Sequence, residues 1–450
     1  MAAPHLPSAQ PTFLQSDRLL ARAAQPLARF LHVEAAGGIL LVAATVAALV
    51  WANSPWQAGY ESLWSSTIRV EVGSYLFEED LGHLVNDLLM AVFFFVVGME
   101  IKRELVVGEL RDRRSVALPA MAALGGMIVP AAIYVAFNAG GDGAGGWGIP
   151  MATDIAFALG VVALLGERVP SSVKVLLLTL AIVDDIGAIA VIAVFYADDL
   201  EPALLLVALG VVAAVAVMHR AHVVYAPVLV VAGMALWLAV YESGVHATIA
   251  GVAMGLLTPA RPFQAELEAE EVVDVLEGRP DLNVEDIRTT ATAIRGSVSA
   301  CDRLIETLHP WTSYVIVPVF ALANAGIVLS ADAFSPPSAV LSGVAVGLVV
   351  GKLLGVAGFS WLAVRIGLGR LPDGARWGHI VGVATVAGIG FTVSLFIAGL
   401  AFDTGSLQTE AKIGTLTASI IAAASGAAIF TIVARSTPTD AGDEPDDGRR

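Results

Sequence analysis

Long uninterrupted apolar blocks constrain this sequence more than any other feature. Many run for about 17–25 residues, the length that a helix needs to cross a hydrocarbon core of about 30 Å at 1.5 Å per residue. The chain of 450 residues is 57% hydrophobic and only 15% charged, whereas soluble domains carry roughly 25% charged residues. The sequence therefore predicts an all-α polytopic membrane protein.

Composition also excludes several kinds of site. Cys301 is the single cysteine, so neither a disulfide framework nor a cysteine-based zinc site can form. A net charge of −16 argues against a nucleic-acid partner, because phosphate binding needs a basic face. The sequence contains no P-loop for ATP. We expect no cofactor and no nucleic-acid partner.

The length criterion gives twelve candidate spans, and the basic residues test that count. With a cytoplasmic N-terminus, the outer segments contain only Arg69 and Lys412 of the 25 Lys and Arg residues, and Lys352 lies inside a span. This asymmetry follows the positive-inside rule and predicts that both termini are cytoplasmic. The spans lie near 35–52, 81–104, 115–137, 147–166, 171–196, 201–218, 223–241, 244–258, 308–328, 337–366, 378–401 and 411–434.

The segments outside the spans are hydrophilic. Residues 1–30 form the predicted cytoplasmic N-terminal segment, and residues 31–435 form the membrane domain. A cytoplasmic acidic loop over 259–306 holds eleven Asp and Glu residues against five Arg, and an acidic tail over 436–450, expected to be disordered, holds five against two. Residues 67–80 alternate around a glycine and predict a small outer β-hairpin, with an irregular loop as the alternative.

Two adjacent acids interrupt the apolar span at 171–196. Asp184 and Asp185 follow Leu180-Ala181-Ile182-Val183 and precede Ile186. One carboxylate at a helix centre costs about 2.5–3.5 kcal/mol, and acids at such a depth mark ion or proton sites. Neighbouring side chains point about 100° apart, so both can face one cavity but cannot both face lipid. The structural alternative is a buried salt bridge that fixes helix register.

Lys352 is the only cation near the middle of a predicted span. It lies too far from either end to reach water along the helix, so it must meet a carboxylate, lose its proton or face a cavity. We expect a pair with Asp184 or Asp185. A purely structural ion pair is the alternative.

Glycine and proline interrupt two other spans. Residues 145–154 end in Thr153 and Asp154 after a Gly-rich and Pro-containing run, and residues 387–392 contain Gly388 and Gly390. Freed backbone groups inside a membrane are tolerated only beside a cavity or packed protein. Asp154 and Lys352 carry the charges that would neutralise the ends of interrupted helices. The alternative is that the glycines serve only close helix packing.

These stretches resemble the NhaA family of bacterial sodium–proton antiporters. The similarity extends over nearly all of residues 30–435. The matching stretches are 85–94 (VNDLLMAVFF), 99–105 (MEIKREL), 152–160 (ATDIAFALG), 181–189 (AIVDDIGAI), 243–248 (SGVHAT), 323–326 (ANAG) and 388–394 (GIGFTVS).

The resemblance implies twelve helices in an inverted repeat, in which spans four and eleven are discontinuous and cross at mid-membrane, a design that this family itself exemplifies. Asp185 would be the principal sodium ligand, Asp184 the proton carrier and partner of Lys352, and Thr153 and Asp154 would support the site. Residues 67–80 would make a homodimer contact.

Other carried-over roles concern the response to pH. The resemblance implies that Glu100, Glu104 and Glu306 line a cytoplasmic funnel associated with pH sensing, and that His246 takes part. An ordinary interfacial histidine is the alternative for His246. The chain departs from the family in an acidic insertion at about 262–303, just before the match resumes at Leu308.

The resulting hypothesis is a secondary transporter of the inner membrane. Na⁺ is a hard cation that prefers oxygen ligands, so the two carboxylates suit it and also bind protons. Competition for one site would exchange cytoplasmic Na⁺ or Li⁺ for external H⁺, electrogenically and under pH regulation. Two alternatives stay open, a sodium-coupled solute symporter and an intramembrane aspartyl protease, in which Asp154 could supply the second acid.

Overall fold

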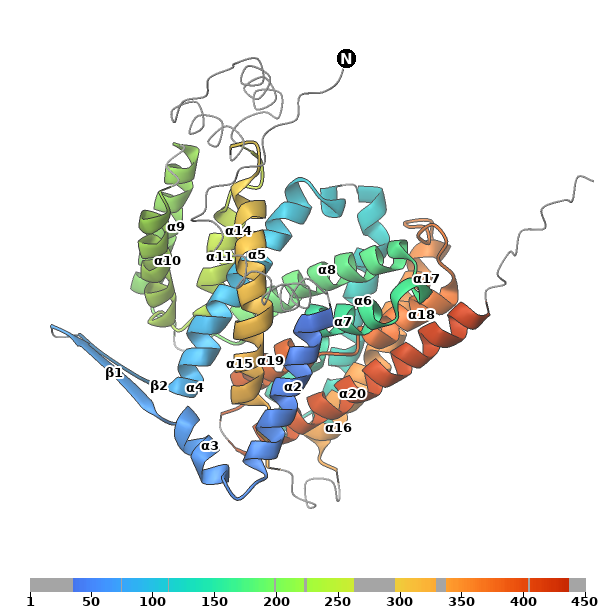
Figure 1. Cartoon of the computed structure of the whole chain (residues 1–450), viewed down its shortest axis with the longest axis horizontal. Helices are drawn as coiled ribbons and strands as arrows, with labels where there is room; N and C mark the ends of the chain where they lie inside the picture. Colours follow the sequence, from blue (N-terminus) through green and yellow to red (C-terminus); the bar gives the residue numbers. More distant parts are fainter. Residues whose placement is uncertain are drawn as a thin grey trace, which may run out of the picture.

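The computed structural model describes residues 35–73, 75–111, 113–197, 200–221, 225–262, 296–328, 337–403 and 405–436. These residues form a bundle of helices with one two-stranded sheet (Figure 1). The predicted segment 1–30, most of the loop 259–306 and nearly all of the tail 436–450 lie outside the described residues, so these domain boundaries stay predictions.

Six helical stretches within the described residues are long and apolar enough to cross a membrane, and the number rises to nine if each of three strongly bent helix pairs is one span. The prediction of a mainly helical membrane protein is therefore confirmed, while the count of twelve spans stays a prediction. The six stretches are Leu81–Val106, Val116–Asn138, Ser171–Phe195, Pro202–Arg220, Ala339–Arg365 and Ser406–Arg435.

Most helices begin and end close to the predicted spans, because apolar blocks and their breakers mark both ends. The exceptions are discussed below. The single helices are α2 (Ala35–Ala52), α6 (Arg113–Asn138), α8 (Ser171–Phe195), α9 (Pro202–Arg220), α10 (Ala226–Tyr241), α11 (Thr248–Leu257) and α20 (Ser406–Arg435). Continuous stretches with a π-helical turn are α4 (Leu81–Leu84), η2 (Val85–Leu89) and α5 (Met90–Val106), then α14 (Ala300–Trp311), η6 (Thr312–Ile316) and α15 (Val317–Asn324), then α16 (Ala339–Val346), η8 (Gly347–Gly351) and α17 (Lys352–Arg365).

Helix α14 corrects the prediction that residues 259–306 form one hydrophilic loop. It begins at Ala300, because Ser299 Oγ accepts a hydrogen bond of 3.0 Å from the backbone N–H of Asp302 and so caps the helix. Cys301 and Ile305 are buried on the face that packs against α5. The charged residues of this helix lie on its other faces, which is why the sequence of this segment resembles a hydrophilic loop.

The short helix between α2 and the hairpin was also not predicted from the sequence. Residues Gln57–Trp64 form α3, which turns by 116° from the end of α2. Its Tyr60 hydroxyl donates to the backbone oxygens of Leu322 and Ala323, at 2.8 and 2.9 Å. The helix therefore packs against the end of α15, a contact that no local pattern reveals.

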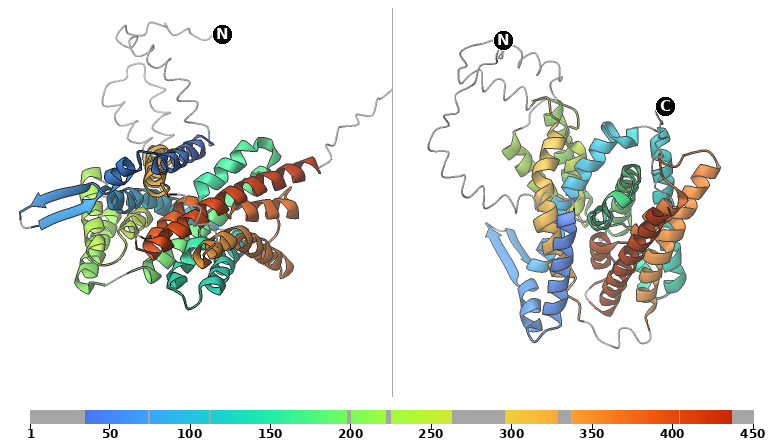
Figure 2. Two further views of the ribbon diagram at one scale, coloured as in Figure 1. Left: turned by 90° about the horizontal axis from the view of Figure 1, so that it is seen from below. Right: turned by 45° about the vertical axis from the view of Figure 1, so that its right-hand side comes forward.

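The predicted hairpin at 67–80 is confirmed, and the alternative of an irregular loop is wrong. Strands β1 (Thr67–Val72) and β2 (Tyr75–Asp80) pair antiparallel with Thr67 opposite Asp80. Gly73 in the turn has φ 64°, a left-handed conformation that favours glycine. The hairpin extends away from the helices in both views of Figure 2.

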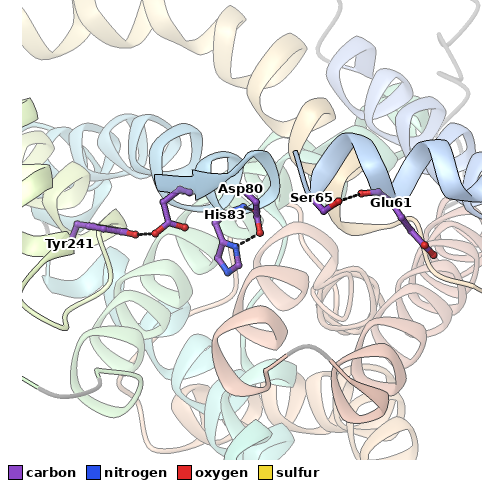
Figure 3. Close-up of polar contacts among 6 residues, drawn as sticks. Glu61, Ser65, Asp80, His83 and Tyr241 are labelled. Carbon is purple, nitrogen blue, oxygen red and sulfur yellow. Dashed lines mark hydrogen bonds and ion pairs between the residues drawn. The ribbon is translucent and has the colours of Figure 1, made fainter. Parts of the chain in front are cut away.

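Polar contacts hold the base of the hairpin (Figure 3). Asp80 accepts hydrogen bonds from the backbone N–H of His83 at 2.7 Å and contacts its ring Nδ1 at 2.9 Å. The Tyr241 hydroxyl at the end of α10 donates to Glu79. Partial burial raises the pKa of Asp80, but the hydrogen bonds and charge of His83 outweigh that effect and hold it below its ordinary value. Strand β2 is thus attached to both α4 and α10.

Candidate functional site

The two acids on α8 lie in different surroundings. Asp184 and Lys352 are both fully buried, and Lys352 Nζ lies 2.6 Å from Asp184 Oδ2. Lys352 Nζ also donates to Thr153 Oγ1 at 3.0 Å. The predicted pairing of the lysine with one of the two acids is confirmed, and the structure selects Asp184.

Asp185 remains without such a partner. Asp185 is 5% exposed, and no hydrogen bond or ion pair joins its side chain to any residue that the structure describes. Asp184 Oδ1 is buried and likewise lacks a partner among those residues. Buried polar atoms in native proteins are almost always paired. Unpaired carboxylate oxygens on adjacent residues therefore indicate a place built for a ligand or a proton.

Two interrupted helix pairs lie next to these acids. The first consists of the 3-10 helix η4 (Asp142–Met151) and α7 (Ile155–Leu164), bent by 45° at the break. The second consists of α18 (Trp377–Val386) and α19 (Phe391–Ala401), bent by 43°. Hydrogen bonds join the breaks directly, from Asp154 N to Ile389 O at 2.7 Å and from Thr153 Oγ1 to Ala387 O at 2.9 Å.

Asp154 caps a helix on each side of this contact. Its Oδ1 accepts from the N–H of Phe157 in α7 at 2.9 Å. Its Oδ2 accepts from the N–H and the hydroxyl of Thr392 in α19, at 2.9 and 2.6 Å. A carboxylate is stabilised at a helix N-terminus by the unpaired N–H groups and the helix dipole. One buried acid therefore neutralises two helix N-termini.

Gly388 and Gly390 provide space for this contact. A Cβ on Gly388 would lie 2.5 Å from the backbone oxygen of Leu348, and one on Gly390 would lie 2.3 Å from Ser394 Oγ and 3.1 Å from Ala152 O. Neither glycine has a positive φ. Close approach, rather than unusual backbone conformation, is the reason for these two glycines.

The predicted pH-response residues do not form one cluster. Glu100 and Glu104 lie half-buried on α5, and Glu306 is exposed on α14, which packs against α5. His246 lies in the turn before α11, whose later residue Gly255 approaches Met99. Since α11 runs parallel to α5, His246 lies toward the opposite end of α5 from Glu100.

Some residues of the site were not predicted from the sequence. The sequence marks Thr392 only as the end of an interrupted run, although its hydroxyl and its backbone N–H both donate to Asp154. Tyr134, Tyr196 and Ser394 bond the backbone of η4. Position next to a helix break is the one local signal that could have identified Thr392 and Ser394.

Comparison with known proteins places the chain in a family. The sequence profile described as Na⁺/H⁺ antiporter 1 matches residues 28–430. Na(+)/H(+) antiporter NhaA 3 of Frankia alni is 47% identical over 421 residues, covering 93% of this chain and 91% of that protein. Na(+)/H(+) antiporter NhaA of Rhodopirellula baltica is 49% identical over 410 residues, covering 89% and 92%.

The buried ion pair lies among apolar helices, and the matching family and relatives are antiporters, so the chain is a membrane transporter rather than an enzyme. The chain belongs to the Na⁺/H⁺ antiporter 1 family. The family resemblance predicted from the sequence is confirmed, and the protease alternative is set aside.

Proposed function

We propose that this protein exchanges cytoplasmic Na⁺ or Li⁺ for external H⁺ across the inner membrane, through one site at Asp184 and Asp185. The names of its relatives supply the two ions. The observation that carries the proposal is the contrast between adjacent buried acids, of which Asp184 pairs with Lys352 while Asp185 has no partner among the described residues.

The free oxygens suit a sodium ion. Asp185 can supply its carboxylate and Asp184 its unpaired Oδ1, and oxygen ligands are those that a hard cation prefers. The Thr153 hydroxyl donates to Ala387 O and accepts from Lys352, which leaves one lone pair. We assign Thr153 mainly to orienting Lys352, and the two acids to binding the ion.

Exchange follows from competition for the same oxygens. A proton on either acid removes negative charge from the shared site and so weakens the site for sodium, and bound sodium weakens it for protons. Two acids can carry two protons in place of one monovalent cation, which makes the exchange electrogenic. While sodium is bound, the positive charge of Lys352 stabilises Asp184 as a carboxylate. When the site returns without sodium, Asp184 can carry a proton.

The membrane arrangement is proposed as twelve spans with both termini cytoplasmic, in an inverted repeat with spans four and eleven discontinuous. The hydrogen-bonded breaks of η4–α7 and α18–α19 support this arrangement. The parallel packing of α5 and α11, with Gly251 against Ala91 and Gly255 against Met99, agrees with two spans that both run inward.

Residues 67–80 are proposed as the contact of a homodimer. The hairpin is a two-stranded sheet with open edges, and it exposes apolar side chains, with Val70 48% and Ile68 37% exposed. Unpaired strand edges favour pairing with a second chain. Regulation by pH is proposed for Glu100 and Glu104 on α5 and for Glu306 on α14, with His246 as a separate candidate.

The proposed exchange is tested by sodium-induced dissipation of a pH gradient in everted vesicles, scanned across pH. Asp185→Asn is expected to abolish the signal, because it removes the carboxylate charge. The matched control is Asp142→Asn, at an exposed acid that begins η4. Full activity in Asp185→Asn would contradict the site. Proteoliposomes with Na⁺ and H⁺ as the only permeant ions separate exchange from solute symport.

A further inference from the structure

The first helix of the broken pair, η4, receives hydrogen bonds from tyrosines on two neighbouring helices. The Tyr134 hydroxyl on α6 donates to Gly143 O at 2.6 Å. The Tyr196 hydroxyl, directly after α8, donates to Gly145 O at 2.9 Å and accepts from Gly148 N–H at 3.1 Å. Two hydroxyls thus bond three backbone groups of one short helix.

The glycines of η4 make these contacts possible. A Cβ on Gly146 would lie 2.4 Å from the Tyr134 hydroxyl, and one on Gly148 would lie 2.7 Å from the Tyr196 hydroxyl. Tyr134 is fully buried and Tyr196 is 8% exposed. Water therefore cannot replace either hydroxyl without movement of the helix.

A short stretch of chain connects this contact to the ion pair. η4 ends at Met151, the fully buried Ala152 follows, and the next residue is Thr153, which bonds Lys352. Tyr196 lies at the end of α8, the helix that carries Asp184. The position of η4 relative to α8 therefore sets where the Thr153 hydroxyl meets the lysine.

We propose that Tyr134 and Tyr196 are positioning residues for ion exchange. Their hydroxyls hold η4 against α6 and α8, so that Thr153 orients Lys352 on Asp184 and leaves Asp185 available to the cation. The inference rests on the proposed exchange at Asp184 and Asp185. The apparent affinity for sodium depends on this alignment. If Thr153 is displaced, it no longer orients Lys352, and the lysine can pair with either acid.

The test compares Tyr134→Phe and Tyr196→Phe with Tyr60→Phe. Tyr60 is an equally conservative control, since its hydroxyl is also bonded to backbone oxygens but at α15, away from η4. Loss of one such hydrogen bond is expected to raise the KM for Na⁺ about threefold to tenfold in the first two variants, with little change in maximal rate. Tyr60→Phe is expected to keep the wild-type KM.

A second readout does not depend on transport. Amide hydrogen exchange of the peptide over 142–151 is expected to accelerate in Tyr196→Phe, which frees the Gly148 N–H, and to stay unchanged in Tyr60→Phe. Unchanged amide exchange in Tyr196→Phe would overturn the anchoring. A KM equal to wild type in both variants, or an equal rise in Tyr60→Phe, would overturn the positioning role. Absence of Na⁺/H⁺ exchange in the wild-type protein would instead overturn the proposed function.

Discussion

Asp154 and Asp80 perform the same local task in two different regions. Each is the residue before a helix and accepts a hydrogen bond from the N–H three residues on, Phe157 for Asp154 and His83 for Asp80. Asp154 is 2% exposed at the contact between the two breaks. The side chain of Asp80, at the base of the hairpin, is 34% exposed.

The difference shows that environment, rather than the capping pattern, sets the energetic value of an aspartate. Water can replace the bonds of Asp80 if they are lost, whereas the N–H groups at Asp154 would be left buried without partners. Asp154 also serves a second helix through Thr392. We therefore expect substitutions to matter most at the breaks and least at the hairpin.

The largest effect is expected for Asp154→Ala. Loss of a cap costs about 0.5–2 kcal/mol, and two caps are lost here in a buried site, so we expect a destabilisation of about 2–4 kcal/mol. Equilibrium unfolding in mixed detergent micelles measures it. Asp154→Asn keeps an acceptor and should cost less. If Asp154→Ala is no less stable than an alanine at Asp80, the comparison fails.

A smaller loss is expected for Gly388→Ala. Its Cβ would lie 2.5 Å from Leu348 O, and overpacking of this kind costs about 1–3 kcal/mol. The matched control is Gly399→Ala on α19, where a Cβ would meet nothing within 4 Å. The control should be neutral or slightly stabilising in the same unfolding measurement. Equal stability of the two variants would show that the breaks are not closely packed.

Thr153→Val removes a buried hydroxyl at nearly constant volume. Lys352 then loses one hydrogen-bond acceptor and Ala387 O loses its donor, for an expected cost of about 1–2 kcal/mol. Thr153→Ser, which keeps the hydroxyl, should restore most of the stability and most of the sodium-dependent exchange. Identical behaviour of the valine and serine variants would remove the role assigned to Thr153.

The smallest effect, and one that depends on pH, is expected for Asp80→Asn. Since the folded-state pKa of Asp80 is lowered, its contribution is present at neutral pH, above the unfolded value of about 3.9, and is lost as the pH falls through the folded pKa. We expect a difference from wild type of at most about 1 kcal/mol at neutral pH that disappears in acid. A difference that grows on acidification would contradict the sign.

The sequence predicts the features that repeat locally. The length of the apolar blocks predicts the helices, and the alternation around Gly73 predicts the hairpin. The glycines and the proline before Thr153 predict one of the two helix breaks. Acids within an apolar run identified Asp184 and Asp185 because the cost of burying them has no local compensation.

The remaining features depend on contacts between distant residues. Neighbouring side chains on a helix point about 100° apart, but only packing decides which of Asp184 and Asp185 meets Lys352. Asp154 bonds Thr392, and Tyr196 bonds Gly148, across separate helices. The start of α14 was missed because its charged face resembles a loop. The hydrophobic pattern of a single segment does not predict these contacts between distant residues.

The most direct test of the account is binding of radioactive sodium to the purified protein across a pH series. If Na⁺ and H⁺ share Asp184 and Asp185, the apparent Kd for Na⁺ should fall as pH rises, by up to about tenfold per pH unit for each proton displaced, and Asp185→Asn should show no specific binding. A Kd that does not change with pH, or wild-type binding by Asp185→Asn, would contradict it.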